Sequence, residues 1–219
     1  MRKIIVLMIL FVLGIVFIGC KNDDLIEIGI LQYVEHNALS EARKGFIDGL
    51  AEAGYIDGEN IRITVLNPQT DAPTMSIQAK DLVRKSDLIL AIATPAASVV
   101  VNEAKDQGKK TPILFTAVTD PVDAKLIASN EAPGGNVTGT NDMNPIKEQV
   151  SLVKELLPDA KELGILYTAS ETNSELQANI AKTEAEKVGL DVIIRTIENI
   201  NDLQLVANQL ASQVDALYI

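Results

Sequence analysis

The chain has 219 residues, of which 19 are Lys or Arg and 30 are Asp or Glu, so its formal net charge is −11. This acidic balance argues against a nucleic-acid-binding protein, because contacts to phosphates need clustered basic side chains. The single cysteine excludes an internal disulfide and any metal site built from several cysteines. The length is sufficient for one large domain or two small ones with a sizeable core.

The amino-terminal segment combines two basic residues with an uninterrupted apolar run over residues 4–19. This run is short for a membrane-spanning helix and typical of a signal-peptide core. It ends in FIGC, which resembles the bacterial lipobox although Phe17 stands where leucine is usual. We predict a signal peptide over residues 1–19, lipid attachment at Cys20 through acyl chains such as palmitate, and a polar tether over residues 20–24. An anchor helix with an incidental cysteine is the alternative.

Strands and helices are predicted to alternate in the next part of the chain. Apolar, β-branched runs indicate strands over residues 25–33, 61–67, 87–93 and 111–118. Between them, helical periodicity and turn signals indicate helices over residues 40–55, 73–85 and 95–108. The 87–93 run is almost wholly apolar, as expected for a central parallel strand covered on both faces.

The alternation stops after Thr119 and starts again near residue 145. A turn signal and a short strand lie within residues 134–140, and a second series then has helices over 145–158, 174–189 and 201–214 and strands over 162–168, 190–197 and 215–219. This pattern predicts an α/β protein with parallel sheets flanked by helices, a first lobe over residues 25–140 and a second over residues 141–219. Because the second series ends in an uncovered strand, we expect an incomplete second lobe and a chain truncated from a longer protein.

The sequence carries no recognisable motif for catalysis. His36 is the one histidine, and no serine in a nucleophile-elbow pattern accompanies it. Neither a phosphate loop nor a dinucleotide-binding fingerprint is present, and the many carboxylates show no metal-ligand spacing. We therefore predict a protein that is not an enzyme and needs no cofactor or metal.

Polar and aromatic side chains follow several predicted strands, where a parallel α/β lobe presents residues to a cleft. Thr94 precedes a helix amino terminus suited to a ligand carboxylate, whereas Asp120, Asp142 and Glu171 are suited to a ligand ammonium group. Tyrosines also lie near strand ends, at Tyr33, Tyr167 and Tyr218. Each residue has an ordinary alternative as a cap, turn former or rim residue. For His36, a further ligand candidate, a role as a loop or capping residue is the preferred interpretation.

Several segments together resemble one protein family. GILQYVEHNALSEARKGFIDGLAEAGYIDGENI, ATPAA, TDPVDAKLI, PGGNVTGTND and GILYTASETNS occur in the order found in ABC-transporter substrate-binding lipoproteins of the tryptophan/tyrosine-type branch. The resemblance implies a two-lobed type I periplasmic-binding-protein fold. It places the following residues at cleft positions: Thr94, Pro95, Ala96, Asp120, Asn141, Asp142, Glu171 and Asn173.

The resemblance implies an extracytoplasmic solute-binding component of an ABC importer. We expect it to capture a small zwitterionic ligand, an aromatic or other amino acid, and to deliver it to a membrane permease driven by an ATPase subunit. The expected protein is a monomer held on the outer face of the cell membrane by its lipid anchor. The alternatives are a membrane-tethered ligand sensor of the same fold and, less favoured, an α/β enzyme acting on a small metabolite.

Overall fold

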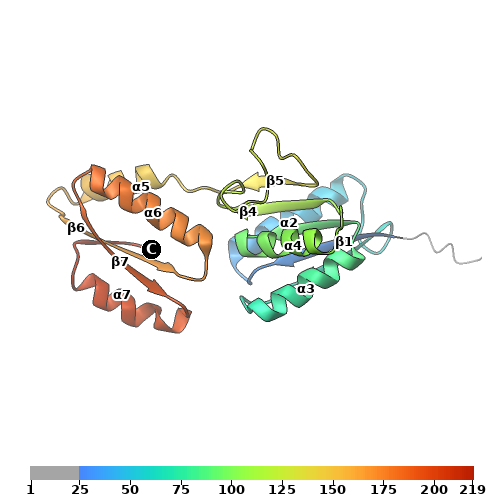
Figure 1. Ribbon diagram of the computed structural model, residues 1–219, viewed down its shortest axis with the longest axis horizontal. Coiled ribbons are helices and arrows are strands. Elements are labelled where there is room, and N and C mark those ends of the chain that lie inside the picture. Colours follow the sequence, from blue (N-terminus) through green and yellow to red (C-terminus); the bar gives the residue numbers. More distant parts are fainter. Residues whose placement is uncertain (1–24) are drawn as a thin grey trace, which may run out of the picture.

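The structure, a computed structural model, describes residues 25–219. The predicted signal peptide, the tether and the lipid-attachment residue Cys20 lie outside the described residues. The described chain forms two lobes, each with a parallel sheet between helices, and a segment after β5 connects them (Figure 1). This arrangement confirms the predicted α/β class. No helix within residues 25–219 is long and apolar enough to cross a membrane.

The first lobe contains a five-stranded sheet in the order β2-β1-β3-β4-β5, with all neighbouring strands parallel. Its strands are β1 (Ile26–Gln32), β2 (Ile61–Leu66), β3 (Leu88–Ile92), β4 (Ile113–Val118) and β5 (Val137–Asn141). Its helices are α2 (Asn37–Glu52), α3 (Ala72–Lys85) and α4 (Thr94–Asp106).

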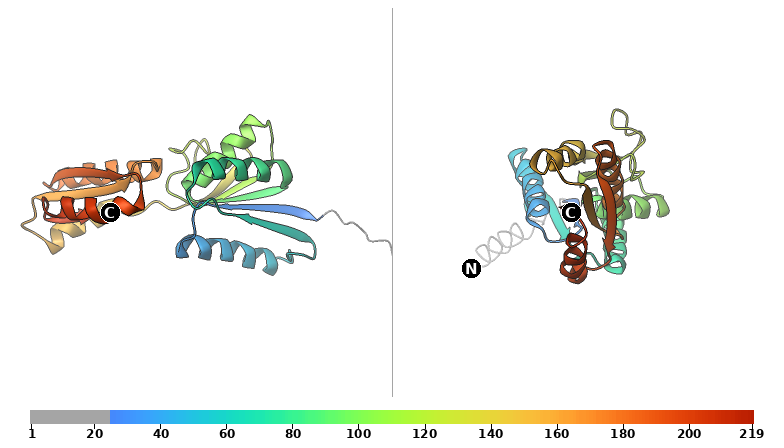
Figure 2. Two further views of the ribbon diagram at one scale, coloured as in Figure 1. Left: turned by 90° about the horizontal axis from the view of Figure 1, so that it is seen from below. Right: turned by 90° about the vertical axis from the view of Figure 1, so that its left-hand side faces the viewer.

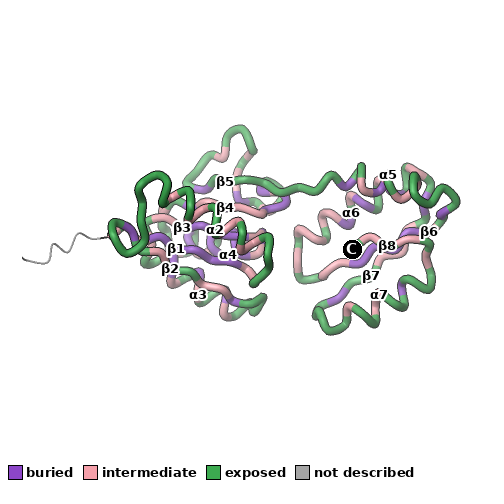
Figure 3. Tube along the Cα trace, turned by 180° about the vertical axis from the view of Figure 1, so that it is seen from behind, coloured by how far each residue is buried: buried purple, intermediate pink, exposed green. Residues whose placement is uncertain are grey.

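Alternation of side chains along the strands covers both faces of this sheet. Leu31 and Ile89 belong to the apolar cluster formed with α3 and α4, whereas their neighbours Ile30 and Leu90 belong to a cluster with α2 on the opposite face. The buried positions are therefore concentrated in the central strands (Figure 3). A sheet buried in this way is a rigid support for the loops at its ends.

The second lobe contains a three-stranded parallel sheet in the order β7-β6-β8. Its strands are β6 (Glu162–Thr168), β7 (Asp191–Ile197) and β8 (Ala216–Tyr218), and its helices are α5 (Ile146–Leu156), α6 (Thr172–Lys187), the 3-10 helix η1 (Ile200–Asp202) and α7 (Leu203–Ala211). Leu163 and Ile165 pack against α5 and α6, while Leu166 packs with Leu210 of α7 on the other face. Both faces of each sheet therefore carry helices (Figure 2).

Two helix boundaries show how local capping shifts the predicted ends. Helix α2 begins at Asn37, before the predicted residue 40, because the Nδ1 atom of His36 accepts a hydrogen bond from the Ala38 N–H group at 3.3 Å. The same helix is followed by Gly54 with a φ of 87°, a conformation that glycine adopts without steric cost. His36 is thus a capping residue, which is one of the two roles preferred for it over ligand binding.

Candidate functional site

The carboxyl ends of the strands in the two lobes point toward each other across the space between the lobes (Figures 1 and 2). A cavity of about 460 Å³ lies in this region and has walls from both lobes. We call it the inter-lobe cavity. The first lobe contributes Tyr33, Val34, Gln69 and Thr70, and the second lobe contributes Thr168, Ser170, Glu171 and residues 197–200.

Electrostatics link the two walls of this cavity. Tyr33 follows β1, and Glu171 is the residue immediately before α6. Partial burial, followed by the negative charge of the Glu171 carboxylate, raises the pKa of Tyr33 to about 12. The phenol therefore stays protonated at neutral pH and can donate its hydrogen to a carboxylate across the cavity.

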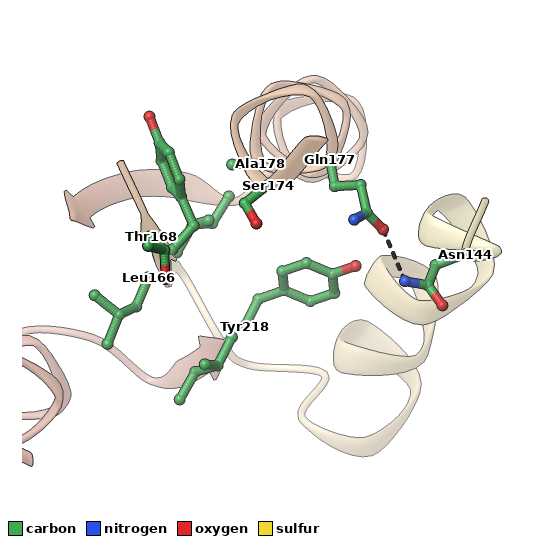
Figure 4. A pocket seen from close by; sticks show the side chains of 10 residues that line it. Asn144, Leu166, Thr168, Ser174, Gln177, Ala178 and Tyr218 are labelled. Atoms are coloured by element: carbon green, nitrogen blue, oxygen red, sulfur yellow. Dashed lines mark hydrogen bonds between the residues drawn. The ribbon is translucent and has the colours of Figure 1, made fainter. Parts of the chain in front are cut away.

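A second pocket, of about 260 Å³, lies at the carboxyl ends of β6 and β8 beside the first turns of α6 (Figure 4). The Tyr218 hydroxyl donates to Oε1 of Gln149 at 2.6 Å, and burial raises the pKa of this phenol. The Asn144 amide donates to Oε1 of Gln177 at 2.7 Å and thereby joins the segment between the lobes to α6. An aromatic ring, hydroxyls and amides therefore line one pocket, a composition suited to a small polar molecule with an apolar part.

Backbone strain is concentrated near the carboxyl ends of the strands in the first-lobe sheet. Four residues other than glycine have positive φ values there: Gln69 (51°), Thr70 (68°), Ala93 (82°) and Ala117 (54°). Ala93 has a ψ of 153°, a combination that is almost restricted to glycine. Such residues persist only where the surrounding structure holds them, and they gather at functional sites.

The strained Ala93 positions the predicted residue Thr94 at the start of α4. The Thr94 side chain is buried, and its Oγ1 atom accepts a hydrogen bond from the Thr119 N–H group at 3.3 Å. Pro95 and the fully buried Ala96 complete the first turn of the helix. The first N–H groups of a helix lack intrahelical acceptors, so this turn can bind an anionic group.

The predicted acidic residues differ in their local contacts. The Asp120 Oδ1 atom accepts hydrogen bonds from the Val122 and Asp123 N–H groups at 2.9 and 3.0 Å, which is the ordinary turn-forming role. The other carboxylate oxygen of Asp120 has no protein hydrogen bond within residues 25–219. Asp142 is exposed directly after β5, and its N–H group donates to the Val118 carbonyl at 2.7 Å.

The remaining predicted residues lie on β5 and α6. Asn141 lines a hollow beneath the loop after β4, together with Pro121 and Ile127, and does not line the inter-lobe cavity. Asn173 lies in the first turn of α6, and its buried Oδ1 atom has no hydrogen-bond partner among the described residues. Of the predicted ligand residues, the structure brings Tyr33 and Glu171 to one cavity and leaves the others at separate points along the strand ends.

Some lining residues were missed by the sequence analysis. Gln69 and Thr70 belong to a turn after the edge strand β2. Their sequence, NPQTD over residues 67–71, indicates a turn but does not indicate a binding site. Asn144 and Gln177 carry no motif, because their pairing joins two segments that are far apart in sequence. No group of three or more His, Cys, Asp or Glu side chains suited to a metal occurs in the described part of the chain.

Comparison with known proteins identifies close similarity over most of the chain. Residues 27–219 match the family described as ABC transporter substrate binding protein. A tyrosine-binding protein from Clostridioides difficile (strain R20291) is 40% identical over 235 residues, an alignment that covers 100% of this chain and 67% of the relative.

Solved structures are also similar to most of this chain. An ABC domain from Streptococcus pneumonia in complex with L-Trp has 39% identity and a TM-score of 0.81, with 88% of this chain and 64% of that chain covered. A ligand-free, open substrate-binding protein from Clostridium difficile has 40% identity and a TM-score of 0.62, with 89% and 65% covered. The chain therefore spans slightly less than two thirds of these structures, and the predicted two-lobed periplasmic-binding-protein fold with an incomplete second lobe is confirmed.

Proposed function

Because this chain belongs to the ABC transporter substrate binding protein family, we propose that it is the extracytoplasmic solute-binding component of an ABC importer. The observation that carries the proposal is the inter-lobe cavity, whose walls come from the strand ends of both lobes. A ligand bound between two lobes favours the arrangement in which both contact it, so binding can be coupled to closure. The closed form would then dock on a permease that ATP hydrolysis drives.

The proposed ligand is an aromatic amino acid, by analogy with the tyrosine-binding relative and the structure with L-Trp. The free carboxylate oxygen of Asp120 would pair with the ligand ammonium group, together with the exposed Asp142, whose N–H group donates to the carbonyl of Val118, two residues before Asp120. The first turn of α4, at Thr94–Ala96, would receive the ligand carboxylate. The second-lobe pocket with Tyr218 offers an aromatic surface for the side chain.

Attachment to the membrane is proposed from the sequence. The apolar run and the FIGC motif support cleavage before Cys20 and acylation of its thiol and amino group. Two or more acyl chains give stable membrane attachment, whereas one chain binds reversibly. The lipid would hold the binding lobes close to the permease on the outer face of the cell membrane.

A thermal-shift panel tests the proposed ligand class. The full chain is heated in detergent with each proteinogenic amino acid in turn. A ligand at about one hundred times its Kd adds roughly 2.7 kcal/mol to the free energy of unfolding. We expect a clear rise in Tm with an aromatic amino acid, and a panel without any rise would contradict an amino-acid ligand.

A further inference from the structure

Two side chains from opposite lobes, Tyr33 and Glu171, line the inter-lobe cavity and are each held by a rigid backbone. The Tyr33 N–H group donates to the Ile92 carbonyl at 3.2 Å, and the Tyr33 carbonyl accepts from the Thr70 N–H group at 3.1 Å. These contacts connect Tyr33 to β3 and to the strained turn after β2. The Tyr33 backbone therefore has a defined position on the first-lobe wall.

Hydrogen bonds also fix the position of Glu171, on the second-lobe wall of the cavity. Its N–H group donates to the Thr168 carbonyl at 3.2 Å, and its carbonyl accepts from the Ser174 N–H group at 3.0 Å. The Ser174 hydroxyl donates to Glu171 Oε2 at 3.0 Å, which fixes the carboxylate at the start of α6. The positive end of the α6 dipole attracts a negatively charged side chain at this place.

Tyr33 and Glu171 line one cavity from opposite lobes, so their separation depends on how the lobes are arranged. Because Tyr33 moves with the first sheet and Glu171 with the second, separation of the lobes moves the two side chains apart. The present arrangement has a TM-score of 0.81 with the L-Trp complex and 0.62 with the open, ligand-free structure, at nearly equal identity and coverage. We call the present arrangement closed.

We infer that Tyr33 and Glu171 form a positioning pair that holds the lobes in the closed arrangement even without ligand. The phenol donates its hydrogen to the carboxylate across the cavity. This inference rests on the proposed solute-binding function. It adds that one residue pair determines the fraction of ligand-free molecules in the closed arrangement. A larger closed population before binding reduces the closure cost that the ligand must supply, so the pair raises apparent affinity.

The test measures the lobe arrangement by fluorescence energy transfer in the full chain without ligand. Exposed sites Glu41→Cys on α2 and Asn179→Cys on α6 carry the two labels, in a Cys20→Ser background. We expect Tyr33→Phe and Glu171→Gln each to lower the ratio of closed to open molecules about three- to tenfold, as for a partly exposed hydrogen bond to a charged group. The double variant should match either single variant, because both remove one interaction.

Glu198→Gln is the matched control, since Glu198 lines the same cavity but does not contribute to the pKa shift of Tyr33. It should leave the ratio unchanged. Equal ratios in the parent, Tyr33→Phe and Glu171→Gln, or a parent with no closed molecules, would overturn the inference. These outcomes are independent of the amino-acid panel, which tests the proposed function.

An alkaline titration of the Tyr33 phenol is a second measurement. Its midpoint would not depend on residue 171 if Tyr33 and Glu171 had separate structural roles. The tyrosinate absorbance of the parent minus that of Tyr33→Phe reports the Tyr33 phenol, whose pKa is raised to about 12. In Glu171→Gln this midpoint should fall toward 10 without reaching it, because partial burial remains. An unchanged midpoint in Glu171→Gln would show that the two groups do not interact.

Discussion

Replacing Ala93 by glycine should stabilise the first lobe, although glycine usually destabilises a folded chain. Ala93 has a φ of 82° and a ψ of 153°, where its Cβ atom causes steric strain. Such a conformation costs on the order of 1–3 kcal/mol for a residue other than glycine. Glycine removes this cost but adds roughly 0.5–1 kcal/mol of unfolded-state entropy. The expected net gain in the free energy of unfolding is therefore about 1 kcal/mol, within a range of roughly 0–2.5 kcal/mol.

Urea unfolding of parent and variant, followed by far-UV circular dichroism, measures this gain as a higher midpoint. Ala104→Gly is the matched control, because Ala104 is a buried residue inside α4 with ordinary helical surroundings. The control should lose about 1 kcal/mol from helix propensity, and more from the lost methyl contacts. If Ala93→Gly destabilised the protein as much as Ala104→Gly, the strain assigned to Ala93 would be refuted.

Three further substitutions test the ligand site, the second lobe and the anchor. Asp120→Asn keeps an oxygen for the turn but removes the charge, so its affinity for the amino acid, measured by calorimetry, should fall about ten- to hundredfold. The control Asp123→Asn should bind with the parent affinity. Equal affinities of Asp120→Asn and the parent would show that the ammonium site is elsewhere. Tyr218→Phe removes the hydrogen bond to Gln149 and should lower the free energy of unfolding, measured by urea denaturation, by about 1 kcal/mol. An unchanged free energy of unfolding would show that this bond does not stabilise the second lobe. Cys20→Ala should abolish labelling by palmitate and release the protein from membranes; persistent labelling would disprove the anchor.

The strands were predictable because their physical signal is local. The apolar run over residues 87–93 was expected to be a central strand, and β3 is buried on both faces between β1 and β4. Residues 162–168 form β6 with the predicted bounds, since an apolar core sequence is limited there by charged and polar neighbours. The cap at His36 agrees with the preferred interpretation of a loop or capping residue, because a polar residue before a helix is a common N-cap.

The inter-lobe cavity was less predictable, because it depends on contacts between segments that are distant in sequence. Tyr33 and Glu171 are both predicted as strand-end residues, but nothing local indicates that they would line the same cavity. The strain at Ala93 left no sequence signal, since glycine would have marked such a conformation and alanine does not. Pairing of Asn144 with Gln177 likewise depends on how α5 and α6 pack together.

Capture of an amino acid between the lobes is tested most directly by calorimetric titration of the full chain with L-tyrosine and L-tryptophan. One binding site per chain is predicted, with a negative heat-capacity change from the apolar surface buried on binding. Asp120→Asn should weaken the same titration. No saturable heat with either amino acid, in a chain shown to be folded, would contradict a site for aromatic amino acids.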